Sequence, residues 1–338
     1  MKSNFPKPVW LVAPFTQFLS FFLVACSVVQ SPASTIEPIT LTIGTVPSPT
    51  ALLEVVALQN GYFSAQGLDV QILEYSSGKV VVDDMLLGKV DAAVSTSLPL
   101  ATNGFSRNDF KIIASMSRLG NDNQVIARAD VGISSIGDLR GKRVGVPKGT
   151  MPQFTLHMFL AQVGMSEKDL VIIYGENNKL IEMLKSGEID AACMLRAKVE
   201  QARLGLGKNA VVFNDDALYK INGFVSVRAD FAQQHPDVVE RFLRACIQAE
   251  DFVLSHQEEA MVILADQFKL DKKQIVDSLE NSSFHVNLDQ ALLIDLETKA
   301  DWMIDEQFSG QKETPNFLPF FYLDALEKID SRRVSIIH

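Results

Sequence analysis

The feature that most constrains the fold is a pattern that occurs twice in altered form. Residues 43–47, IGTVP, resemble residues 144–147, VGVP, and each run precedes a helical pattern. Residues 85–93, MLLGKVDAA, resemble residues 183–192, MLKSGEIDAA. Gly44 and Gly145 are 101 positions apart, and Asp91 and Asp190 are 99 apart. These offsets are far longer than a solenoid repeat, so they predict two lobes of like construction whose facing loops form a cleft.

Residues 141–164 show how each unit is built. A β-rich run at 143–146 meets a turn at Pro147 and Gly149, and a helix then begins with Thr150 as its expected N-cap and Pro152 in its first turn. The unpaired N–H groups of a helix N-terminus suit an oxyanion or a polar small molecule. The alternation of strands and helices along the chain predicts a mostly parallel sheet in each lobe, with crossing strands at 124–128 and 222–227.

Composition limits the class of protein. A chain of 338 residues with 47% hydrophobic and 21% charged residues has enough apolar material for one large or two ordinary domains. Its net charge of −10 argues against nucleic acid as a partner, because phosphate binding needs concentrated Lys and Arg. The 5 histidines show no metal spacing, and no nucleophile or phosphate-loop motif occurs. We therefore expect no catalytic residue, no metal and no cofactor.

The N-terminus has the pattern of an export signal over residues 1–25. Lys2 and Lys7 precede an apolar span at 9–25, which is too short, and interrupted by Pro14, for a mature transmembrane helix. The run LVAC at 23–26 resembles a bacterial lipobox, in which Cys26 is lipidated and attaches the chain to the membrane through two apolar anchors. The alternative is an ordinary secretory signal with an incidental Cys26. Residues 26–38 read as a flexible tether, and we expect Cys193 and Cys246 to be buried and unpaired.

Five phrases in order carry a family resemblance: residues 61–68, 87–92, 138–146, 184–191 and 231–239. With them the chain resembles the solute-binding lipoproteins of ABC importers, in the family of nitrate, sulfonate and taurine binders and thiamine-pyrimidine synthases. The resemblance implies an α/β fold of the bilobal periplasmic-binding-protein type II. Two three-layer lobes would be joined by two crossing segments, with lobe 1 at 39–122 and 223–330 and lobe 2 at 123–222.

The same resemblance implies a function. The lobes would close on a small ligand and deliver it to an ABC permease, and the chain would be a monomer, exported and lipid-anchored at the periplasmic or extracellular face of the membrane. The ligand would be a small organic or inorganic anion of the sulfonate or nitrate kind, or a pyrimidine-type metabolite. Two alternatives stay open: a ligand-sensing module for a membrane signalling partner, and an enzyme like the thiamine-pyrimidine synthases. Those enzymes carry a cysteine-rich run, where this chain has only Cys193.

Candidate ligand-binding residues are those that follow strands or begin helices, or that lie at the crossings, because ligands of open α/β sheets bind beyond the carboxyl ends of strands. They are Ser48, Ser76, Ser77, Gly78, Thr96, Ser97, Asn123, Gly149, Thr150, Met194, Arg196 and Asn222. The hydroxyls can instead be plain N-caps. Arg196 can clamp an anion in bidentate fashion or lie on the solvated surface, and we expect Lys148 at the rim of the site.

Overall fold

The computed structural model describes residues 1, 4–9, 38–120, 122–215, 218–272, 275–276 and 282–337. The chain divides into the segment Met1–Ile36 and a folded unit, Glu37–His338, to which all the described helices and strands belong. The predicted signal peptide, Cys26 and the tether lie almost wholly outside the described residues. Their assignment stays a prediction.

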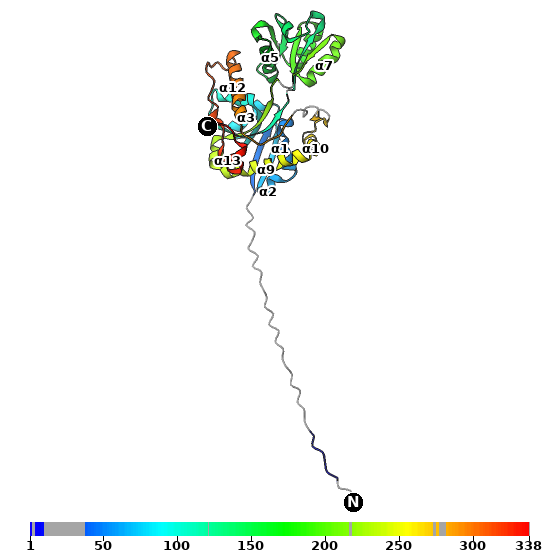
Figure 1. The fold of residues 1–338 in the computed structure, drawn as a ribbon, viewed down its shortest axis with the longest axis vertical. Coiled ribbons are helices and arrows are strands. Elements are labelled where there is room, and N and C mark those ends of the chain that lie inside the picture. Colours follow the sequence, from blue (N-terminus) through cyan, green and yellow to red (C-terminus); the bar gives the residue numbers. More distant parts are fainter. Residues whose placement is uncertain are drawn as a thin grey trace. The chain divides into compact units, whose positions relative to one another are not determined.

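The folded unit contains two five-stranded sheets, one in each of two lobes (Figure 1). The first sheet has the order β2 (Leu68–Glu74), β1 (Ile39–Thr45), β3 (Ala92–Thr96), β10 (Ile221–Arg228), β4 (Phe110–Leu119). The second has the order β7 (Val171–Tyr174), β6 (Arg143–Val146), β8 (Ala191–Leu195), β5 (Asn123–Arg128), β9 (Ala210–Phe213). The prediction of a bilobal α/β fold is confirmed.

In each sheet a single strand runs against the other four. β10 pairs antiparallel with β3 and β4, and β5 pairs antiparallel with β8 and β9, while the remaining pairs are parallel. Each antiparallel strand comes directly after the chain crosses from one sheet to the other. It therefore begins at the edge where the parallel strands of its new sheet end. The mostly parallel sheets expected from the sequence are therefore present. The predicted lobe boundaries stay a prediction; β5 begins at Asn123, and β10 begins at Ile221.

The two longest of the described helices belong to the first lobe. There α1 (Leu52–Gln59) packs on α2 (Tyr62–Ala65), α9 (Pro236–Ser255) and α10 (Gln257–Phe268), and α4 (Ser97–Gly104) packs on α12 (Gln290–Asp305). The other α-helices of this lobe are α3 (Gly78–Leu86), α8 (Ala229–Gln234) and α13 (Asp324–Asp330). The second lobe has α5 (Met151–Gln162), α6 (Asn177–Ser186) and α7 (Arg196–Leu206). Short 3₁₀ turns lie at Pro49–Ala51, Ala129–Val131, Ile136–Leu139, Glu167–Asp169, Gly207–Asn209, Leu318–Phe320 and Ser331–Arg333.

The two halves of the sequence repeat occupy equivalent places in the two sheets. Asp91 precedes β3, and its carboxylate accepts hydrogen bonds from Thr42 N at 2.8 Å and Thr42 Oγ1 at 2.7 Å. Asp190 precedes β8, and its carboxylate accepts from Arg143 N at 2.9 Å and pairs with the Arg143 guanidinium at 2.6 Å. Each aspartate thus ties the start of one parallel strand to its neighbour and holds the register of the pair.

The repeated glycines are explained by close packing. A Cβ on Gly145 would lie 2.7 Å from Ile189 Cδ1 and from Leu180 Cδ2, and one on Gly44 would lie 3.1 Å from Tyr75 and Val81 side-chain atoms. Leu180 of α6 and Val81 of α3, together with Ile189 and Tyr75 from adjoining loops, therefore pack directly on the strands at these two positions, and only glycine leaves the room.

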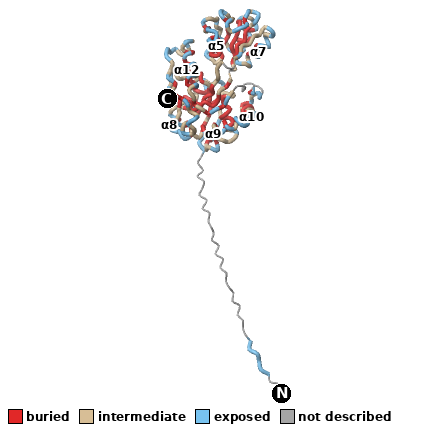
Figure 2. Tube along the Cα trace, in the orientation of Figure 1, coloured by how far each residue is buried: buried red, intermediate tan, exposed pale blue. Residues whose placement is uncertain are grey.

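The core lies inside each lobe, where the buried residues gather (Figure 2). On β5, Val125 and Ala127 face a cluster built with α5, whereas Ile126 faces a cluster built with α6 and α7. Successive strand residues point to opposite faces, so a strand that is apolar at every position needs a helix layer on each side. This gives the second lobe its three layers.

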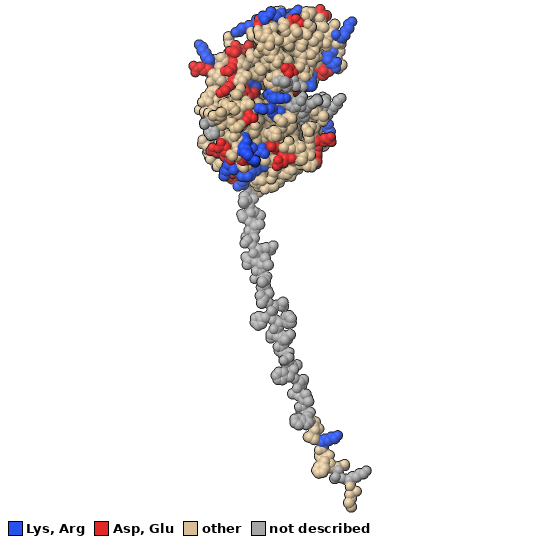
Figure 3. Space-filling model, in the orientation of Figure 1, with Lys and Arg blue, Asp and Glu red and all other residues tan. Residues whose placement is uncertain are grey.

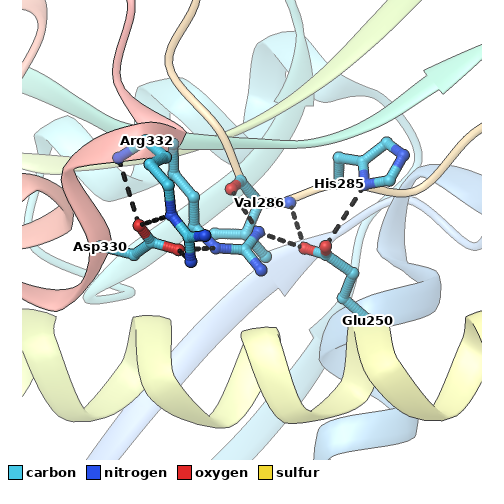
Figure 4. Close-up of polar contacts among 6 residues, drawn as sticks. Glu250, His285, Val286, Asp330 and Arg332 are labelled. Carbon is cyan, nitrogen blue, oxygen red and sulfur yellow. Dashed lines mark hydrogen bonds and ion pairs between the residues drawn. The ribbon is translucent and has the colours of Figure 1, made fainter.

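The C-terminal part of the chain is fastened to the first lobe by a buried carboxylate. Glu250 of α9 is 4% exposed and accepts hydrogen bonds from Val286 N at 2.7 Å and Arg333 Nη1 at 2.7 Å, with His285 Nδ1 at 3.3 Å (Figure 4). Nearby, Asp330 accepts from Arg332 Nε at 2.9 Å. One acid thereby connects a helix to two segments that are distant in the sequence.

A second buried acid in the same lobe lacks such partners. Glu54 of α1 is 0% exposed, and neither of its carboxylate oxygens has a hydrogen-bond partner among the described residues. Burial raises its pKa to about 8. The buried Cys246 thiol of α9 is close enough for the Glu54 charge to add to the rise of its pKa, which burial mainly causes.

We predict that Glu54→Gln stabilises the protein at neutral and alkaline pH. A carboxyl whose folded-state pKa lies above its unfolded value contributes stability below the unfolded value and loses it as pH rises through the folded value. The variant should gain about 3 kcal/mol in free energy of unfolding at pH 7, and well under 1 kcal/mol near pH 4.5. Urea denaturation from pH 4.5 to 8 measures this. The exposed Glu259→Gln is the control, and an equal effect of both variants at all pH values would contradict the prediction.

Candidate functional site: a cavity between the two sheets

A cavity of about 840 Å³ lies between the carboxyl ends of the parallel strands of the two sheets. The first sheet and the helices that follow its strands contribute Val46, Ser48, Thr50, Ser77, Gly78, Val94, Ser95, Thr96 and Ile221. The second sheet and its loops contribute Asn123, Pro147, Lys148, Thr150, Met151, Pro152, Tyr174, Gly175, Glu176, Asn177 and Leu195. This is the position at which open α/β sheets bind ligands.

The side of the cavity formed by the first lobe carries hydroxyl groups. Ser48 and Thr50 share a hydrogen bond of 2.7 Å between their hydroxyl oxygens. Ser77 is the N-cap of α3 and accepts from Val80 N at 3.4 Å, so this hydroxyl has a capping role as well as a place in the lining. Ser95 and Thr96 end β3. Five hydroxyls and one helix N-terminus therefore converge on one side of the cavity, a combination of donors that suits oxygen acceptors.

The opposite side combines apolar residues with a cation and other polar groups. Pro147, Met151, Pro152 and Leu195 line it, and Lys148 extends among them. The Lys148 ammonium lies 5.3 Å from the centroid of the Tyr174 ring and 5.8 Å from that of Phe308, so it contacts aromatic faces instead of a described carboxylate. Glu176 is the other charged lining residue. On the visible face of the molecule, acidic and basic side chains are interspersed (Figure 3).

A buried glutamine supports the loop at the start of α5. Gln153 is 0% exposed; its Oε1 accepts from Gly149 N at 2.7 Å, and its Nε2 donates to Glu167 Oε2 at 2.8 Å and to the Tyr174 hydroxyl at 3.3 Å. Burial raises the pKa of Glu167 to about 7, against the lowering effect of the Gln153 amide. The loop at Gly149 and the Tyr174 ring are thus held by one side chain.

Six of the twelve predicted binding residues line this cavity. They are Ser48, Ser77, Gly78, Thr96, Asn123 and Thr150. Thr150 stands at the N-cap position of α5, but its hydroxyl donates to Pro147 O at 2.7 Å instead of capping the helix. No ligand contact follows from lining alone, so the binding role of these residues stays a prediction.

The other six predicted residues lie outside the lining of the cavity. Met194 and Asn222 are buried within strands, where their neighbours Leu195 and Ile221 face the cavity instead, because successive strand residues point to opposite faces. Ser97 is 2% exposed inside the first turn of α4. Ser76 is exposed to solvent, and Gly149 gives its N–H to Gln153.

Arg196 also lies outside the lining. Its Nε donates to Asp122 Oδ1 at 3.1 Å, and its backbone N donates to Asp122 O at 2.8 Å, at the first passage between the sheets. The carboxylate that the guanidinium contacts is therefore one of the chain's own. Lys148, expected at the rim, is exposed and is the lysine of the lining.

Sequence reasoning missed the segment Tyr174–Asn177, which joins β7 to α6 and lines the cavity. The repeat contains the signal that could have found it. β7 is the counterpart of β2 in the order of the two sheets, so this segment corresponds to Ser76–Gly78, which was predicted. Thr50 and Ser95 were missed although they adjoin predicted residues.

Other kinds of site find no support among the described residues. No group of three His, Cys, Asp or Glu side chains could hold a metal ion there. Cys193 and Cys246 are buried, unpaired thiols, and burial raises the pKa of Cys193 far above its ordinary value, so it is not a thiolate. No described helix has the length and apolar character that a bilayer span requires.

A family model described as NMT1/THI5 like matches residues 49–260, which is more than half of the chain. The chain belongs to the NMT1/THI5-like family. The match begins at the 3₁₀ turn that follows β1 and ends in α10, so it includes most of the cavity lining.

Individual proteins and solved structures are similar to this chain. A Bacillus subtilis protein, named provisionally as an aliphatic sulfonates-binding protein, is 26% identical over 231 residues, covering 67% of this chain and 70% of its own. The periplasmic aliphatic sulphonate binding protein SsuA from Escherichia coli has a TM-score of 0.66 at 16% identity, covering 84% of this chain and 99% of its own. The desulfurization enzyme DSZB has a TM-score of 0.60 at 16% identity, covering 87% and 99%. These structures share the fold, which therefore serves both binding proteins and an enzyme.

We predict that Gln153→Leu destabilises the protein most at alkaline pH. Above pH 7 the buried Glu167 carboxyl is largely ionised, and the variant removes a donor from it. The free energy of unfolding should fall by about 3 kcal/mol at pH 8 and by about 1 kcal/mol at pH 5, where Glu167 is protonated. Denaturant unfolding at both pH values measures the loss. Gln162→Leu, at an exposed position of the same helix, is the control; a loss that does not depend on pH would contradict the role assigned to Glu167.

Proposed function

We propose that this chain is the solute-binding receptor of an ABC importer, which captures a small organic anion between its lobes and delivers it to a membrane permease. The observation that carries the proposal is the cavity of about 840 Å³, which equivalent strand ends of both lobes line. The comparisons support it, since a relative and a structure of the same fold carry sulfonate-binding names. Contacts from two lobes link ligand affinity to lobe closure.

The size and lining of the cavity favour an organic ligand over an inorganic anion such as nitrate. A volume of about 840 Å³ falls in the range of sites that hold drug-sized molecules. We propose that the hydroxyls of the first lobe receive the oxygens of the anionic head, while the apolar side chains of the second lobe, among them Met151 and Leu195, contact the organic part. Lys148 would supply the positive charge.

We propose the two lobes as predicted, 39–122 with 223–330 and 123–222, and a monomeric chain that meets its permease through both of them. The sensing module has no observation of its own in its favour. The shared fold of the enzyme DSZB is the observation in favour of an enzymatic function. The Cys193 thiol does not support such a function, because it is buried and lies outside the cavity lining.

The ligand class is tested by thermal shift of the chain from residue 27 onward. We expect 1-butanesulfonate to raise Tm by mass action at millimolar concentration, and nitrate, bicarbonate and a pyrimidine to raise it less. Lys148→Met should weaken binding of the sulfonate about tenfold. Lys185→Met, an exposed lysine on α6, should leave it within about twofold, and so should Arg196→Ala. A shift with the inorganic anions alone, or equal losses in the Lys148 and Lys185 variants, would refute the proposed anion site.

We also propose that the chain is exported and anchored by lipid on Cys26. The pattern of Lys2, Lys7, the apolar span and LVAC supports this, as does the periplasmic location in the name of the Escherichia coli protein. In cells given an alkyne-tagged fatty acid, the chain should carry the label in the membrane fraction, and Cys26→Ser should remove the label and release the protein from the membrane. Labelling that survives Cys26→Ser would count against the anchor.

A further inference from the structure

Beside the cavity, an aromatic and cationic contact joins the second lobe to the first. Phe154 of α5 packs edge-on against Trp302 of α12, with ring centroids 5.4 Å apart and planes at 77°. Phe154 is 1% exposed and Trp302 is 2% exposed. Leu98 and Met303 of the first lobe complete the cluster. We call this the α5–α12 contact; buried aromatic area of this kind is a main source of stability at interfaces.

A buried lysine strengthens the same contact. Lys299 of α12 is 1% exposed, and its ammonium lies 4.5 Å from the centroid of the Phe154 ring and 5.6 Å from that of Tyr219. The ammonium is paired with Asp295, whose other oxygen accepts from Asn222 Nδ2 at 3.1 Å. A cation held away from water binds an aromatic face more strongly than an exposed one does.

Tyr219 extends the contact to the segments where the chain crosses between the two sheets. Its hydroxyl lies 2.6 Å from Thr155 Oγ1 of α5 and accepts from Asn123 Nδ2 at 3.3 Å. Asn123 lines the cavity and begins β5. The contact thus involves both lobes and the connecting chain.

The position of Phe154 on α5 connects this contact to the cavity wall. Thr150, Met151 and Pro152 line the cavity at the start of the helix, and Phe154 follows within one turn. A helix moves as a rigid element over such a length, so a displacement of Phe154 from α12 also displaces the wall. At the same edge, Lys148 contacts Phe308 of the first lobe.

We infer that Phe154 and Lys299 are positioning residues: the α5–α12 contact holds the second lobe's wall opposite the hydroxyls of the first lobe, and thereby sets how tightly the cavity retains its ligand. Their role in the arrangement of the lobes follows from the geometry alone, whereas their role in ligand retention rests on the proposed function.

The arrangement is tested without ligand. Nitroxide labels at Leu254→Cys on α9 and Leu204→Cys on α7, both exposed, report the distance between lobes in the full chain carrying Cys26→Ser. Phe154→Leu removes the aromatic face but keeps an apolar side chain. Phe159→Leu is the matched control, because Phe159 is on the same helix but packs in the second lobe's own core. Pulsed electron paramagnetic resonance gives the distance distributions.

We expect Phe154→Leu and Lys299→Met to broaden the distribution and shift it to longer distances, and Phe159→Leu to leave it unchanged even where it lowers Tm. Distributions that are the same in the Phe154 and Phe159 variants would overturn the inference. A purely structural role would lower Tm in both variants without separating the lobes, so the distance readout distinguishes the two.

The effect on retention is measured by titration calorimetry with 1-butanesulfonate. We expect Phe154→Leu to weaken binding about tenfold and Phe159→Leu to change it less than about twofold. Equal affinities in the two variants would overturn the link to retention. If the unsubstituted chain does not bind butanesulfonate, the proposed ligand class fails, and the distance measurement still decides whether the contact sets the lobe arrangement.

Discussion

The structure depends on two antiparallel strands, β5 and β10, each of which enters its sheet directly from the other lobe. Because they run against four parallel strands, their first residues lie at the carboxyl ends of their neighbours. Both passages between lobes are therefore located at the edge where the parallel strands end. The loops of both sheets meet there, and the cavity is the consequence.

The two lobes are alike in topology but not in the chemistry that they bring to the cavity. Among the described residues, five hydroxyl residues and no charged residue line the cavity from the first lobe, whereas the second lobe brings Pro147, Met151 and Leu195 together with the charged Lys148 and Glu176. The framework is alike in the two halves because equivalent residues stabilise it. Asp91 and Asp190 hold the strand register, and Gly44 and Gly145 permit close packing. The framework residues and the cavity residues are separate sets, so the lining can differ while the fold stays the same.

The buried ionisable residues Glu250, Lys299 and Glu54 differ in whether they have partners for their charge. Glu250 has several donors and fastens the C-terminal segments, and Lys299 has a carboxylate and two rings and joins the lobes. Glu54 has no such partner among the described residues, and burial shifts its pKa upward instead. The difference follows from the cost of an ion in a dry environment, which must be offset by partners or avoided by protonation.

The sequence by itself determined the alternating elements, the two like halves, the glycine turns and the order of the family phrases, because these depend on local propensity and on periodicity. It also placed Ser48, Ser77 and Thr150 at strand ends and helix starts. Which of two adjacent residues faces the cavity, Leu195 or Met194, Ile221 or Asn222, was decided by the register and direction of the strands in the sheets. The pairing of Arg196 with Asp122, and of Phe154 with Trp302 and Lys299, joins residues that are distant in the chain. The sequence indicates that Lys299 is buried, since it falls on the apolar face of α12. It does not indicate the partner of Lys299, because a local pattern shows that a side chain is buried and not what it is buried against.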